Sequence, residues 1–145
     1  MKTGTSLASL LMLALAFAGA PAFAATSVAP ALPVGPPPQA DAPPSNKWRL
    51  EFSGAAESAG EIVLAVADTR GAHFEVRVPI ERNDGENRVS GKVRRALDRA
   101  LPWGWRVERD DGEDVLVKRR LYHPRFQVAL VSSTVKDVRI NLDRE

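Results

Sequence analysis

The chain contains 145 residues, and its 20 basic and 18 acidic side chains give a formal net charge of +2. It contains no cysteine, which excludes disulfides, catalytic thiolates and metal sites built on thiolates. The small net charge gives no support to non-specific nucleic-acid binding, because that binding depends on a strongly positive surface field.

Residues 1–24 contain the three parts of a secretory signal peptide in their usual order. Lys2 supplies the basic start, residues 7–18 form an apolar core, and residues 22–24 place two alanines before a cleavage site. A membrane-spanning helix needs about 20 apolar residues, so this core is too short for an uncleaved anchor. We therefore expect cleavage after Ala24, no membrane span in the mature chain, and export. The lack of cysteine favours a bacterial protein, periplasmic or secreted.

Residues 25–46 are rich in proline and alanine and contain seven of the eleven prolines of the chain. Such a segment buries too little apolar surface to offset the entropy of folding, and we expect a disordered linker. It acts either as a ligand for a partner or as a leader that assists export. The remaining residues, 47–145, have the length of one small domain with one core.

Three strands are predicted before the helix. Apolar and polar side chains alternate at residues 48–52, which is the pattern of a strand with one buried face. Residues 62–66 form a continuous apolar run that is typical of a central strand. Residues 74–80 alternate again, and Pro79, which has no N–H to donate, places this strand at an edge or a bulge.

A single helix is predicted next, because apolar residues recur at spacings of three and four between residues 89 and 100. Asn83, followed three residues later by Glu86, predicts a capping box at its start. Pro102 predicts its end near Ala100 or the following residue.

Four strands are predicted after the helix, at residues 105–109, 115–119, 126–130 and 138–142. The first two form a hairpin with the three-residue loop Asp110-Asp111-Gly112, because glycine suits the left-handed position that such a loop requires. This register sets Val107 opposite Val115 and Trp105 opposite Val117.

The alternation in these strands favours antiparallel pairing with one face packed against the helix. We therefore predict a single small α+β domain, with one amphipathic helix on a mainly antiparallel sheet of about seven strands in the order βββαββββ. Exposed edge strands would allow two chains to pair, so a homodimer is an open alternative.

Three short patterns could carry chemistry, and each has a simpler structural interpretation. Ser133 and Lys136 match the Ser-x-x-Lys pattern of penicillin-binding enzymes, but they lie between strands and the companion motifs are absent. His73 and His123 lie in predicted loops and have no second metal ligand at helical spacing. The acidic residues around Gly112 fail the EF-hand pattern and suit a hairpin tip. We predict no catalytic residue, metal or cofactor, and keep a small hydrolase that uses His123 as an alternative.

The strongest lead is a basic stripe on the predicted helix, which consists of Arg88, Lys92, Arg95 and Arg99. At about 100° per residue, these side chains lie beside the apolar face of the helix. They could meet phosphate, an acidic polysaccharide or an acidic protein surface. An ordinary solvated helix face is the structural alternative.

Trp103 follows the helix in a predicted turn, with no pattern that buries it. An exposed tryptophan near arginine is common at binding surfaces, although Trp103 could equally cover the helix end. These leads predict a non-enzymatic, exported interaction domain that presents the helix and Trp103 to a protein or another envelope component. The alternative is charge-driven binding of an anionic envelope polymer or nucleic acid through the basic stripe, with steep salt dependence.

Overall fold

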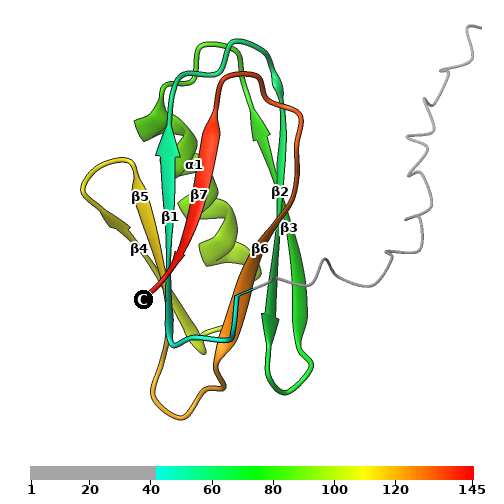
Figure 1. Ribbon diagram of the computed structural model, residues 1–145, viewed down its shortest axis with the longest axis vertical. Coiled ribbons are helices and arrows are strands. Elements are labelled where there is room, and N and C mark those ends of the chain that lie inside the picture. The colour runs from blue at the N-terminus through cyan, green and yellow to red at the C-terminus, as the bar shows by residue number, and fades with distance from the viewer. Residues whose placement is uncertain (1–41) are drawn as a thin grey trace, which may run out of the picture. The chain divides into compact units, whose positions relative to one another are not determined.

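The computed structural model describes residues 42–145 (Figure 1). The predicted signal peptide and most of the predicted linker lie outside the described residues. Residues 42–46, which the sequence assigns to the linker, lie against the folded domain. Ser45 forms an isolated antiparallel bridge with Phe126, and the Gln127 side chain donates a hydrogen bond to the Ala42 carbonyl (2.8 Å). No helix in this part of the chain is long and apolar enough to cross a membrane.

Seven strands and one helix follow in the order βββαββββ. They are β1 (Lys47–Ser53), β2 (Gly60–Asp68), β3 (His73–Ile80), α1 (Glu86–Ala100), β4 (Trp105–Asp110), β5 (Asp114–Arg119), β6 (Phe126–Ser133) and β7 (Arg139–Arg144). All the strand pairs are antiparallel. The predicted fold class, a single small α+β domain, is confirmed.

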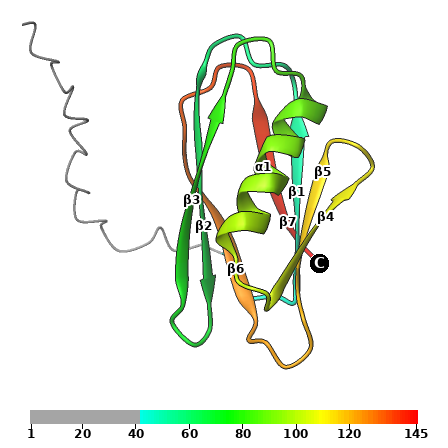
Figure 2. The same ribbon diagram turned by 180° about the vertical axis from the view of Figure 1, so that it is seen from behind.

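The strands form two sheets, ordered β4-β5-β1-β7 and β3-β2-β6. Figure 2 shows α1 lying across one side of the domain, where it contacts β3 of one sheet and β4 of the other. Both are edge strands. On the side away from the helix, the Trp48 indole N–H of β1 donates to the Phe126 carbonyl of β6 (2.9 Å). The helix therefore packs against the edge strands of both sheets.

The core lies between the two sheets and the helix. The alternation predicted for β1 is confirmed, since Trp48, Leu50 and Phe52 are buried there. The prediction of a central strand at residues 62–66 is also confirmed, because β2 lies between β3 and β6 and these residues are buried on both faces. Pro79 lies in the edge strand β3, as its missing N–H predicts.

The start of α1 differs from the prediction. The helix begins at Glu86 with Gly85 as its N-cap, and no side chain caps it, so the capping box of Asn83 and Glu86 is wrong. Asn83 has a left-handed backbone (φ 68°). Asp84 is fully buried, and its carboxylate accepts a hydrogen bond from the Glu81 N–H (2.9 Å), which closes the preceding turn. Because the Asp84 side chain takes part in that turn, the N-cap is Gly85, two residues after the predicted Asn83.

The β4–β5 hairpin has a three-residue loop, but the predicted register is wrong by two residues. Val107 pairs with Val117 and Asp110 with Asp114, so the loop is residues 111–113. The like charges of this last pair are held together by Arg49 of β1, which lies 3.2 Å from the Asp110 carboxylate and 3.1 Å from that of Asp114. A shift of two residues keeps every side chain on its predicted face.

Candidate functional site

The structure separates the five predicted site residues into three environments. Arg88 and Lys92, in the first half of the basic stripe, contact a buried carboxylate. Lys92 Nζ lies 2.6 Å from Asp84 Oδ2, and Arg88 lies 3.5 Å from Oδ1. A second carboxylate, that of Glu81, lies 3.4 Å from Lys92. Lys92 is therefore paired within the fold, whereas Arg88 lies near the same carboxylate and is mostly exposed.

Asp84 is ionised in this arrangement. Burial by itself would raise the pKa of Asp84, but the hydrogen bonds from Lys92 and from the Glu81 N–H outweigh it and hold the pKa below its ordinary value. The role of Lys92 is therefore to compensate a buried charge that fixes the start of α1. That role leaves it little capacity for an external anion.

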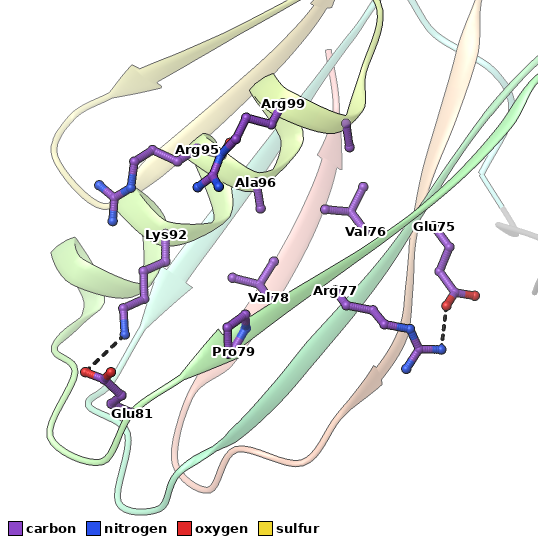
Figure 3. A pocket seen from close by; sticks show the side chains of 11 residues that line it. Glu75, Val76, Arg77, Val78, Pro79, Glu81, Lys92, Arg95, Ala96 and Arg99 are labelled. Atoms are coloured by element: carbon purple, nitrogen blue, oxygen red, sulfur yellow. Dashed lines mark hydrogen bonds and ion pairs between the residues drawn. The ribbon is translucent and has the colours of Figure 1, made fainter. Parts of the chain in front are cut away.

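Arg95 and Arg99, in the second half of the stripe, have no carboxylate partner among residues 42–145. Both are exposed, and Arg99 Nε donates a hydrogen bond to the Arg95 carbonyl (3.1 Å). They border a groove of about 550 Å³ between α1 and β3, shown in Figure 3, whose lining includes Ala96, Ala100 and residues 75–79. We call this the α1–β3 groove.

Trp103 lies elsewhere, in the α1–β4 turn, and the residue is 75% exposed. It contacts the β5–β6 loop, because its ring packs edge-on against His123 (centroids 5.2 Å apart) and Arg120 lies 6.0 Å from its centroid. Leu121 and Tyr122 lie between these two residues and are 84% and 93% exposed. We call the group Trp103, Arg120, Leu121, Tyr122 and His123 the Trp103 corner.

Two loops are locked together beneath this corner. The Arg120 N–H donates to the Gly104 carbonyl (2.8 Å). A side chain at position 104 would overlap the imidazole of His123, so any residue larger than glycine must displace that ring. The imidazole itself lies between Trp103 and Trp105, 5.7 Å from the centroid of Trp105. His123, the residue considered for acid–base chemistry, thus packs between two aromatic rings.

A tight turn projects Leu121 and Tyr122 away from the domain. The His123 N–H donates to the Arg120 carbonyl (3.1 Å), which places the two apolar residues at the middle positions of a β-turn. Tyr122 has a φ of 70°, a conformation that turns of this kind usually give to glycine or asparagine. A non-glycine residue there costs free energy, and such strain clusters at functional sites.

The corner continues into a basic and apolar hollow of about 580 Å³. Besides Trp103 and residues 119–122, it is lined by Arg106, Glu108 and Lys118. Lys118 and Glu108 are paired across the β4–β5 ladder (2.7 Å), and this pairing holds the pKa of Glu108 below its ordinary value. Glu108 also contacts Arg106, and its single negative charge is outnumbered by the cations that line the hollow.

Sequence reasoning identified Trp103 and missed Leu121 and Tyr122. Their signal is present in the sequence, because two large apolar residues stand between Arg120 and His123-Pro124 without any strand or helix period. Their exposure depends on the turn at residues 120–123, which no local period in the sequence predicts. Val131 of β6, at 38%, is the remaining large apolar residue found exposed in the described part of the chain.

The other chemical leads are placed as follows. Ser133 ends β6, paired with Ile62, and the backbone N–H of Lys136 donates to the Ser58 hydroxyl (3.1 Å). His73 is exposed at the start of β3. Within residues 42–145, no group of three or more histidine and acidic side chains could hold a metal ion.

No protein-family model matches this chain. No curated protein matches it either.

Proposed function

We propose that this protein is an exported, non-enzymatic binding domain that holds a protein partner of the cell envelope through the Trp103 corner. The observation that carries the proposal is the gathering of Trp103, Leu121 and Tyr122 on two interlocked loops, each at least three-quarters exposed. Exposed apolar side chains that stand singly need no explanation, whereas a cluster of them on one surface is typical of an interaction site.

The composition of the corner supports a protein partner. Tryptophan, tyrosine and arginine are the residues that most often dominate the binding energy of protein interfaces. The strained backbone of Tyr122 adds a second argument, because the turn would be more stable with glycine. A binding role for the side chain would explain why a large aromatic residue stands there in place of glycine.

The alternative function is charge-driven binding of an anionic envelope polymer through the basic stripe. Asp84 pairs closely with Lys92 and lies 3.5 Å from the exposed Arg88, whereas Arg95 and Arg99 have no carboxylate partner in the described part of the chain. Each neutralised phosphate contributes about one unit to the slope of log affinity against log salt, so binding through Arg95 and Arg99 predicts a slope of about two. An affinity that stays constant between low and moderate salt would count against the polymer function.

A site-specific crosslink tests the protein-binding proposal. The photoreactive residue p-benzoylphenylalanine replaces Tyr122, with the same replacement at Val131 as the matched control. We expect a product of discrete mass from position 122 in the producing cells and none from position 131. The product should disappear when Trp103→Ala is added, because hot-spot substitutions weaken binding by about tenfold or more. No product, or the same products at both positions, would contradict the proposal.

Export is tested separately. Mass spectrometry of the protein from the periplasmic and medium fractions should give an N-terminus at Ala25. An intact Met1 in a cytoplasmic fraction would remove export from the proposal and leave the binding surface to be tested by the crosslink.

A further inference from the structure

The outer edge of β3 has no partner strand among the described residues, because β3 pairs only with β2. In an antiparallel pair, every second residue exchanges hydrogen bonds with its partner, and the residues between direct their N–H and C=O groups outward. The Asp68 N–H donates to the Ala72 carbonyl (2.9 Å), so these two residues form a hydrogen-bonded pair. Counting in steps of two from Ala72, the residues that bond to β2 are Phe74, Val76 and Val78. The outward groups therefore belong to Glu75, Arg77 and Pro79. Pro79 has no N–H, and at its position the backbone of β3 donates no hydrogen bond to β2.

The register of β2 gives the same alternation independently. The Glu61 N–H donates to the Thr134 hydroxyl (2.9 Å), and the Glu61 carbonyl accepts from the Thr134 N–H (3.0 Å). The backbone groups of Glu61 therefore point toward the β6 side and away from its partner Pro79. Between residues 75 and 79, two N–H groups and three carbonyls at the edge of β3 have no partner strand within residues 42–145.

This open edge is one wall of the α1–β3 groove, and the helix is the other (Figure 3). Val76 and Val78 line it from the strand and are almost fully buried against the helix side of the core. The small side chains of Ala96 and Ala100 line it on the helix. A groove between a strand edge and a helix is the geometry in which extended peptides add to a sheet.

The charge and spacing of the helix wall indicate what kind of peptide fits. Arg95 and Arg99 are one turn apart, about 6 Å along the helix axis. Alternate side chains on one face of an extended strand are about 6.7 Å apart. Two acidic side chains at positions i and i+2 of an added strand would therefore match the two arginines. A second copy of this chain fits less well, because it would bring its own Arg95 and Arg99 to the same place.

We propose that the α1–β3 groove binds an extended acidic segment of a partner protein, which pairs with the edge of β3 and places acidic side chains at alternate positions beside Arg95 and Arg99. This surface is separate from the Trp103 corner, so the proposal goes beyond the function proposed above and does not depend on it.

Random seven-residue peptides displayed on phage, selected on the mature chain, test this proposal. We expect enrichment of sequences with acidic residues two positions apart. The enriched peptide should bind the double variant Arg95→Glu/Arg99→Glu at least tenfold more weakly. A matched control, Arg70→Glu/Arg82→Glu, reverses two exposed arginines outside the groove and should bind like the wild type.

Strand pairing has its own readout. Binding of the enriched peptide should protect the amide hydrogens of Glu75 and Arg77 from exchange, and N-methylation of alternate peptide amides should abolish binding. The variant Trp103→Ala should bind the peptide normally, which separates this result from the crosslinking experiment. The proposal would be overturned if acidic residues were not enriched, or if the double variant bound the peptide with unchanged affinity. It would also be overturned if the amides of Glu75 and Arg77 were protected by dimerisation of the chain and not by the peptide.

Discussion

Replacing Tyr122 with glycine should stabilise the domain while it weakens partner binding. Tyr122 has a left-handed backbone, and the residue is 93% exposed. The left-handed conformation costs an L-residue about 1–2 kcal/mol, and glycine loses about 0.5–1 kcal/mol more backbone entropy on folding. Because almost no burial is lost, the net gain should be about 0.5–1 kcal/mol.

Calorimetry and urea denaturation of the wild type and the variant measure this gain. For a domain of this size, we expect the midpoint of thermal unfolding to rise by about 3 °C. Tyr122→Val is the matched control, because it keeps an apolar side chain but a β-branched residue tolerates positive φ least. The midpoint of this control should fall.

A lower midpoint for Tyr122→Gly would refute the reasoning, since it would mean that the tyrosine stabilises the fold by contacts. A higher midpoint with full crosslinking at a second corner position, Leu121, would mean that the strain has no connection with binding. Greater stability together with lost binding is the result that the Trp103 corner requires.

Two further predictions concern the supports of the helix and the corner. Asp84→Asn should destabilise the domain by about 2 kcal/mol at pH 7, because it removes the charge that pairs with Lys92. The folded pKa of Asp84 is lowered, so its contribution is present above the unfolded pKa and is lost as the pH falls below about 4. Urea denaturation at pH 7 and pH 3 should show the difference between variant and wild type shrinking. Gly104→Ala should displace the imidazole of His123 from between the two tryptophans, at a cost of about 1 kcal/mol. Loss of the ring-current shift of His123 in NMR spectra checks this, and an unchanged shift would contradict the close approach.

The two proposed surfaces differ in what makes them specific. The Trp103 corner presents exposed apolar area on loops that are fixed by Gly104 and the turn at residues 120–123. The α1–β3 groove presents backbone donors and acceptors beside two guanidinium groups, those of Arg95 and Arg99, which have no carboxylate partner among the residues that the structure describes. Because the chain offers both, a partner with an acidic extended segment and an apolar patch could occupy them together, and affinity would then exceed that of either surface alone.

The sequence by itself determined the class and order of the elements. Alternation at Trp48, Leu50 and Phe52, the apolar run of β2 and the helical period before Pro102 are local patterns, and each reports which face of an element is buried. Local patterns also limited Pro79 to an edge or a bulge and placed Trp103 in a turn, but they left open whether Trp103 is exposed or covers the helix end.

Tertiary structure decided the features that depend on distant residues. The division into two sheets follows from which strands pair, and strand pairing leaves no trace in a single element's period. The hairpin register is supported by Arg49, which lies 61 residues from Asp110. The basic stripe looked uniform in sequence, yet the buried Asp84 carboxylate pairs closely with Lys92 and lies near Arg88. Arg95 and Arg99 have no carboxylate partner within residues 42–145. Burial of the Asp84 carboxylate depends on packing across the whole domain, which helical periodicity cannot report.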